Sequence, residues 1–120
     1  MILLDYFCSV IIQFTDPGYF KLKALQWASS SDVFCYLDSN NFHDQYSKFD
    51  LLLAVGVKDE IIAKAGSAFD ELEQFHTKDP GWTTGFFTYD LKNEVENLVS
   101  GNSDHLHFPD LYSAAPKHLL

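Results

Sequence analysis

The sequence predicts an α+β fold in which a mainly antiparallel sheet is flanked by helices, in a single domain over residues 1–120. Two observations support this class. Stretches with helical periodicity alternate with apolar, β-favouring runs along the chain. A short charged stretch at 57–60 also separates two such runs, as expected for a hairpin turn that leads into a short third strand at 61–63. Because a tight turn joins only antiparallel neighbours, we expect a mainly antiparallel sheet.

The composition excludes several classes of partner. The 120 residues carry 8 basic and 17 acidic side chains, so a net charge of −9 would repel nucleic acid and anionic membranes. With 47% hydrophobic and 16% aromatic residues, the chain has the composition of a folded domain and not of a disordered acidic tail. Cys8 and Cys35 lie in apolar runs without Cys-x-x-Cys spacing, which indicates buried free thiols and a cytoplasmic location.

The N-terminal part is predicted to form a strand followed by a helix. Residues 8–14 are rich in β-branched side chains, and the apolar stretch 1–14 is shorter than the ~20 residues that a membrane span needs. Thr15 or Asp16 can then cap a helix that has Pro17 in its first turn. Apolar residues continue at helical spacings as far as Ala28, and the polar stretch 29–32 ends the helix.

The stretch 33–57 organises the rest of the chain. Residues 33–37 and 49–55 are apolar and β-favouring, and the intervening 38–46 are polar and turn-rich. We interpret the stretch as strand, loop and strand, with the second strand ending at Gly56.

The C-terminal half is predicted to contain two helices and two strands. Ser67, three residues before Asp70, approximates a capping box for a helix that 79–81 terminates. Residues 82–89 place aromatics on both faces of a strand, which predicts a central position in the sheet. A short helix at 91–98 and a last strand that begins near Pro109 complete the chain.

The loop of the organising stretch brings together a set of polar and aromatic side chains that suits a small ligand. Two hydroxyls, a cation and aromatic rings would meet at one sheet edge, where they form a small polar pocket with an aromatic lining. An amino acid needs donors and acceptors for its ammonium and carboxylate groups and an apolar slot for its side chain. The alternative is that the serines are ordinary turn residues and the aromatics belong to the core. The candidate binding residues are Leu37, Ser39, Tyr46, Ser47, Lys48 and Phe49.

Two motifs in this stretch resemble a known family. Leu37-Asp38-Ser39 at a strand end and Tyr46-Ser47-Lys48-Phe49-Asp50 downstream are similar to motifs in the N-terminal domain of the chorismate-utilising enzymes, aminodeoxychorismate synthase component I and anthranilate synthase component I. In that family the two motifs form a pocket for free tryptophan, which is structural in one branch and inhibitory in the other. Lys48 stands where the family often has Arg, and a lysine lacks the planar fork for bidentate carboxylate binding.

The resemblance covers about 20–120 and includes two further motifs. The segment Gly85-Phe86-Phe87-Thr88-Tyr89-Asp90-Leu91 is similar to the family's Gly-x-x-Gly-Tyr-Asp-Leu, with Thr88 in place of the second glycine. Phe108-Pro109-Asp110-Leu111 is similar to its Pro-Asp segment. The resemblance implies the N-terminal part of a layered fold in which two sheets pack between helices.

The resemblance also implies a function. The contexts of Leu37-Asp38-Ser39 and of Tyr89-Asp90-Leu91 favour the non-catalytic N-terminal segment of an aminodeoxychorismate synthase component I, which aminates chorismate for 4-aminobenzoate and folate synthesis. Anthranilate synthase component I with a feedback site, or a free-standing small-molecule binding module, remain alternatives. The implied partners are the catalytic C-terminal domain, a glutamine amidotransferase subunit and a free amino acid.

No catalytic residue, metal site or cofactor is predicted within this segment. The family's chorismate site and the glutamates that hold Mg²⁺ lie in its C-terminal region, so the 120 residues alone are expected to be inactive. Asp104, His105, His107 and Asp110 do not complete a metal-ligand set. Glu94 and Glu96, about 200° apart on a helix, are expected to lie on a solvated face.

Overall fold

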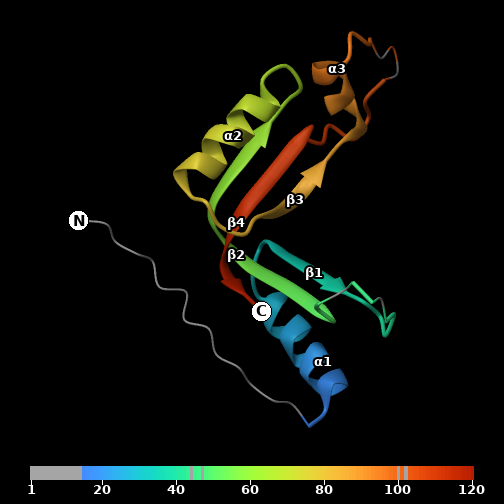
Figure 1. Cartoon of the computed structure of the whole chain (residues 1–120), viewed down its shortest axis with the longest axis vertical. Helices are drawn as coiled ribbons and strands as arrows, with labels where there is room; N and C mark the ends of the chain where they lie inside the picture. The colour runs from blue at the N-terminus through green and yellow to red at the C-terminus, as the bar shows by residue number, and fades with distance from the viewer. Residues whose placement is uncertain (1–14, 44, 47, 100, 102) are drawn as a thin grey trace, which may run out of the picture.

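The chain folds as an α+β structure, which confirms the predicted class and the antiparallel sheet. The computed structural model describes residues 15–43, 45–46, 48–99, 101 and 103–120. Within them, three α-helices accompany a curled four-stranded antiparallel sheet, a half-barrel, with the strand order β1-β2-β4-β3 (Figure 1). The elements in chain order are α1 Pro17–Ala28, β1 Phe34–Asp38, β2 Leu51–Ala63, α2 Ala68–Lys78, β3 Thr84–Phe87, the 3₁₀ helix η1 Tyr89–Leu91, α3 Lys92–Val95 and β4 Leu111–Leu119.

The hairpin turn predicted at 57–60 is wrong, because β2 continues through it. The strand has 13 residues and pairs with β4 from Ala54 opposite Leu119 to Ala63 opposite Leu111. The charged stretch forms a β-bulge instead, with a register shift between Val57 and Asp59, and Gly56 precedes it at a φ of 69°. The extra residue is accommodated by a local bend, so the strand does not end. The antiparallel sheet therefore arises from pairing between distant segments and not from that turn.

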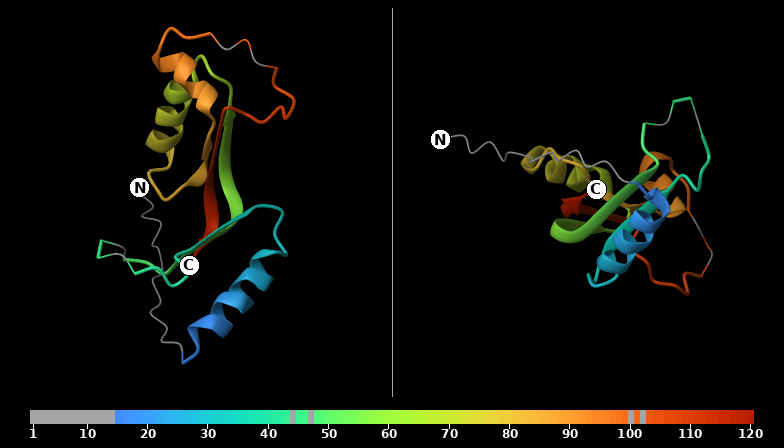
Figure 2. Two further views of the ribbon diagram at one scale, coloured as in Figure 1. Left: turned by 90° about the vertical axis from the view of Figure 1, so that its right-hand side faces the viewer. Right: turned by 90° about the horizontal axis from the view of Figure 1, so that it is seen from below.

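The bulge places the two long helices on opposite faces of the sheet. In α1, Ala24 and Ala28 pack against Leu53 and Val55 of the first half of β2. Beyond the bulge the alternation of side chains is shifted by one residue, so Ala63 of β2 lies on the other face, where it packs with Ala68 of α2. Figure 2 shows the helices on the two sides of the sheet.

The central position predicted for 82–89 is also wrong, because β3 is the short edge strand of the described sheet. Its aromatics Phe86 and Phe87 are 43% and 60% exposed, so the covering layers that two aromatic faces suggested are not present among the described residues. Gly85 lies so close to β4 that an added Cβ would collide with the Tyr112 carbonyl oxygen.

Strand β4 lies in the interior of the sheet, between β2 and β3, and it extends well past the predicted 109–112. It runs to Leu119 and contains Pro116, a residue that cannot donate a ladder hydrogen bond. Pro116 lies opposite Val57, at the irregularity in β2, which is a position where a sheet tolerates proline.

The helix predictions are largely confirmed. Asp16 caps α1 by accepting a hydrogen bond from the Tyr19 amide at 3.0 Å, with Pro17 in the first turn. Helix α2 forms as predicted, but the capping box is wrong, because the Ser67 side chain makes no cap bond. Instead, its hydroxyl donates to Glu71 at 2.7 Å. The helix predicted at 91–98 ends earlier, at Val95.

The predictions for the N-terminal strand and the two cysteines can be compared with the structure only in part. The strand predicted at 8–14, together with Cys8, lies outside the described residues, whereas Cys35 is a free, half-buried thiol. None of the described helices has the length and hydropathy that a bilayer crossing requires.

Candidate functional site

The end of β1 is shaped by a tight turn that contains the first candidate motif. Ser39 follows the strand, and its carbonyl accepts a hydrogen bond from the Phe42 amide at 2.9 Å. The two residues between Ser39 and Phe42, Asn40 and Asn41, have φ angles of 51° and 63°. The turn therefore has the type I′ pattern, which Asn tolerates better than most residues other than Gly. Asp38 also accepts from the Asn40 amide at 2.9 Å, which fixes the start of the turn.

The second motif returns to the same strand end. The Ser39 amide donates to the Asp50 carbonyl at 2.9 Å, and the next pair in the register is Asp38 opposite Leu51. Ser39 and the residue that closes the second motif are thus in direct contact through their backbones. The structure brings together the two segments that the candidate site requires.

The Ser39 hydroxyl is buried without a hydrogen-bond partner among the residues that the structure describes. The residue as a whole is only half-buried, so its hydroxyl lies just beneath the surface. A buried polar group that lacks a partner costs about 1–3 kcal/mol. An incoming donor or acceptor at this position would remove that cost.

The other candidate residues that the structure describes lie on an exposed surface. Leu37 is 57% exposed, Tyr46 80% and Phe49 52%, and Lys48 is exposed as well. Ser47 lies outside the described residues. The alternative interpretation of Tyr46 and Phe49 as core residues does not agree with these exposures.

The sequence prediction missed a set of polar contacts centred on the Asp38 carboxylate, next to Ser39. Lys21 of α1 bonds to Asp38 at 2.7 Å, and the Tyr36 hydroxyl donates to the same carboxylate at 3.3 Å. The hydrogen bond from Lys21, followed by that from the Asn40 amide, holds the pKa of Asp38 below its usual value. The same contact raises the pKa of Lys21, and burial followed by the charge of Asp38 raises that of Tyr36. This carboxylate anchors α1 to the strand end that carries Ser39.

Trp82 was also missed, because the sequence assigned it only to one face of a strand. It lies in the connection between α2 and β3, and its ring meets that of Phe49 edge to face, with centroids 6.4 Å apart. No local signal predicts this contact, since it depends on the curl of the sheet.

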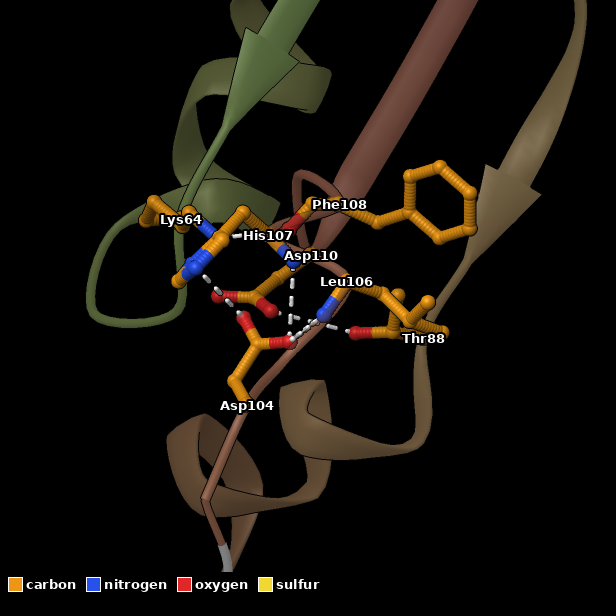
Figure 3. Close-up of polar contacts among 7 residues, drawn as sticks. All are labelled: Lys64, Thr88, Asp104, Leu106, His107, Phe108 and Asp110. Atoms are coloured by element: carbon orange, nitrogen blue, oxygen red, sulfur yellow. Dashed lines mark hydrogen bonds and ion pairs between the residues drawn. The ribbon is translucent and has the colours of Figure 1, made fainter.

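Asp104, His107 and Asp110 belong to a cluster of polar contacts (Figure 3). Asp104 accepts from the Leu106 and His107 amides, each at 3.0 Å. Asp110 accepts from the Ala65 amide at 2.8 Å and from the Thr88 hydroxyl at 3.2 Å. Within the described part of the chain, no three or more His, Cys, Asp or Glu residues are arranged to hold a metal ion. Asp104 instead fixes its own loop, and Asp110 connects the start of β4 to the segments before α2 and after β3.

The cluster also joins two of the family-like motifs. Thr88, which replaces the family's second glycine, donates both its amide, to the Asp110 carbonyl at 2.8 Å, and its hydroxyl, to the Asp110 carboxylate. The threonine is therefore accommodated by a contact with the Pro-Asp segment.

Glu94 is not part of a solvated face, and that expectation is wrong. Its carboxylate accepts from the Gly66 amide at 2.9 Å and from the Ala68 and Phe69 amides at 3.0 Å each. These amides, first that of Phe69, lower the pKa of Glu94. Because the first amides of a helix have no partner within it, Glu94 caps α2 from a distant segment.

Two surface hollows lie outside the candidate site. One is lined by Asp70, Glu73, Gln74, Thr77 and Lys78 of α2, and the other by Thr15, Asp16, Tyr19, Phe20 and Lys23 at the start of α1. Both are open to solvent, and neither lining includes a candidate binding residue.

Comparisons with protein-family models, with curated proteins and with solved structures found no match.

Proposed function

We propose that this chain is the non-catalytic N-terminal segment of an aminodeoxychorismate synthase component I, and that it holds a tryptophan-type amino acid at the end of β1. The family-like motifs in the sequence support the enzyme class. Two observations on Ser39 support the ligand site. Its buried hydroxyl has no partner among the described residues, and its backbone amide donates to Asp50 of the second motif. In the complete enzyme the segment packs on the catalytic domain, which works with a glutamine amidotransferase subunit.

The chemistry of the strand end suits the two charged groups of an amino acid. The Ser39 hydroxyl can donate to a carboxylate or accept from an ammonium group. Lys48 supplies a positive charge at the exposed side of the site, and as a lysine it acts as a point charge and not as a bidentate fork. The exposed rings of Tyr46 and Phe49 provide apolar surface for the side chain.

An uncovered apolar row on the sheet supports a covering domain. Ile62, Tyr112 and Phe86 are consecutive partners across β2, β4 and β3, and Ile62 and Phe86 are 61% and 43% exposed. Phe108, 60% exposed, extends the row, with its ring centroid 6.2 Å from that of Phe86. Contiguous exposed apolar surface marks interaction sites in proteins that are otherwise well folded.

The test is a titration of the isotope-labelled chain with free L-tryptophan, observed through the backbone-amide NMR spectrum. We expect dispersed signals, with shifts confined to Ser39 and its neighbours and to 46–50. Ser39→Ala should abolish these shifts. Ser30→Ala, at an exposed serine after α1, is the matched control and should preserve them. A dispersed spectrum that does not respond to tryptophan would rule out the ligand site.

A further inference from the structure

The Asp38 carboxylate joins α1 to the turn that carries Ser39. Its Oδ1 atom accepts from two donors, the Lys21 ammonium at 2.7 Å and the Asn40 amide at 2.9 Å. Its Oδ2 atom accepts from the Tyr36 hydroxyl at 3.3 Å. The three donors belong to the helix, to the turn and to the strand, so this one carboxylate ties all three together.

The packing of α1 places Lys21 over the strand end. Lys21 precedes the two buried alanines of α1 by three and seven residues, so all three share one face of the helix. The alanines pack with Leu53 of β2, which lies opposite Tyr36 of β1. Asp38, two residues beyond Tyr36, is on the same face of the sheet. Only 19% of the Lys21 side chain and 26% of the Asp38 side chain are exposed, so the ion pair is partly shielded from solvent.

Lys21 also lies within electrostatic reach of the second motif. The pKa of Lys21 is raised first by its hydrogen bond to Asp38, then by the charge of Asp38 and by that of Asp50. Asp50 closes the second motif, and its carbonyl accepts from the Ser39 amide at 2.9 Å. The ammonium group of Lys21 is therefore attracted by the carboxylates of both motifs, next to the backbone bond that brings the motifs together.

The backbone of the Ser39 turn depends on the Asp38 carboxylate. Asn40 and Asn41 both have φ angles in the left-handed region, which is unfavourable for a residue with a Cβ atom. A carboxylate that accepts from the amide two residues further on stabilises such a turn, and Asp38 does so at Asn40. A contact that fixes this carboxylate therefore also fixes the turn, and with it the buried Ser39 hydroxyl.

We propose that Lys21 is a positioning residue of the amino-acid site, and that through Asp38 it holds the Ser39 turn in the conformation that binds the ligand. This inference rests on the proposed function and assigns to the site a residue of α1 that lies outside the two motifs. In this role Lys21 does not contact the ligand. It restricts the turn before the ligand binds, which lowers the cost of ordering the site.

The first experiment measures the affinity of the full chain for L-tryptophan by isothermal titration calorimetry. Lys21→Met should weaken binding about fivefold, the effect of one partly exposed ion pair. Lys21→Arg keeps the charge and the donor and should retain most of the affinity. Lys78→Met is the matched control, because Lys78 of α2 binds Asp59 of β2 at the same distance, 2.7 Å, in the other half of the sheet. This variant should keep the native affinity.

The outcomes separate the inference from the proposed function. If the native chain does not bind L-tryptophan, the proposed site itself fails. If the native chain binds and Lys21→Met binds equally well, Lys21 has no positioning role, although the site stands. An equal loss of affinity in Lys21→Met and Lys78→Met would also overturn the inference, because it would reflect a general loss of stability.

The second experiment is a double-mutant cycle with Asp38→Asn. This substitution keeps an oxygen for the Asn40 amide but removes the charge that attracts Lys21. Lys21→Met should therefore have little further effect on L-tryptophan binding in the Asp38→Asn chain. A fivefold loss in both backgrounds would mean that Lys21 does not act through Asp38, which would overturn the inference. If Lys21→Met does not fold, native affinity in Asp38→Asn would overturn it as well.

Discussion

The two ends of β2 have similar apolar packing, but they differ in whether the polar side chains near them have hydrogen-bond partners among the described residues. Each end packs against one helix, with Leu53 fully buried at the α1 end and Leu111 of β4 fully buried at the α2 end. At the α2 end, Glu94 and Asp110 bind backbone amides of the segments around the helix. At the α1 end, the Ser39 hydroxyl is buried without a partner among the described residues.

This difference separates a structural end from an end that is suited to a ligand. Satisfied carboxylates at the α2 end fix the helix and the connections to β3 and β4. The strand tip at the α1 end also has a fixed backbone, through Asp38 and the Ser39 amide, but within the described residues its Ser39 hydroxyl has no hydrogen-bond partner. Buried polar groups without partners are rare in folded proteins, so this hydroxyl requires an explanation, and the proposed ligand supplies one.

The largest expected effects come from truncating the two buried leucines. Leu53→Ala and Leu111→Ala should each lower the free energy of unfolding by about 2–5 kcal/mol, because each leaves a cavity in a small core. Leu22→Ala on α1 is the control, since this side chain is 62% exposed, and it should have little effect. Urea denaturation followed by circular dichroism measures all three.

Urea denaturation also tests whether the two ends fold as one unit. Because β2 and β4 pair along both halves, we expect a single transition. Single-tryptophan forms that retain Trp27 or Trp82 report on the α1 end and on the entry to β3, respectively. Two different midpoints in these forms would show that the ends unfold independently.

A smaller effect is expected from removing the charge that caps α2. Glu94→Gln should lower the melting temperature, because a neutral amide oxygen accepts the three α2 amides more weakly than a carboxylate does. Glu96→Gln, two residues further along and exposed, is the matched control and should leave the melting temperature unchanged. An equal change in both variants would contradict the cap.

The Glu94 cap also predicts the sign of a pH effect. The pKa of Glu94 is lowered from 4.5 in the folded chain, so its contribution is fully present above 4.5 and is lost as the pH falls through the folded value. The difference in melting temperature between the native chain and Glu94→Gln should therefore shrink below pH 4.5. Other carboxylates titrate in both proteins, and their effects cancel in the difference.

The sequence predicted the elements that depend on local signals. Asp16 with Pro17 marks the start of α1, and the apolar spacing with Asp79 at its end marks α2, because caps and periodicity act within a few residues. The segments of β1 and of the start of β2 followed from apolar runs bounded by polar turns, and the candidate site was placed at their junction for the same reason.

The errors concern interactions between distant segments. A charged stretch such as 57–60 is compatible with either a turn or a β-bulge. It forms a bulge because β2 pairs with β4 on both sides of it. Glu94 was placed on a solvated face because the sequence does not show that its carboxylate reaches the amides before α2. Lys21 and Trp82 were missed because their contacts with Asp38 and Phe49 depend on the packing of α1 and on the curl of the sheet.

The smallest expected effect on stability belongs to Ser39→Ala, and it separates the two ends of β2 most sharply. Removing a buried hydroxyl that has no partner in the described part of the chain should leave the free energy of unfolding unchanged or raise it by about 1 kcal/mol, whereas most core substitutions lower it. In Ser30→Ala the lost hydroxyl bonds to the Trp27 carbonyl at 2.7 Å, so that control should be slightly destabilised. Urea denaturation with and without saturating L-tryptophan completes the test: the ligand should stabilise the native chain and the Ser30 variant but not the Ser39 variant. Destabilisation of the ligand-free Ser39 variant by more than about 1 kcal/mol would mean that its hydroxyl is already satisfied within the chain, and the strand tip would then be as structural as the α2 end.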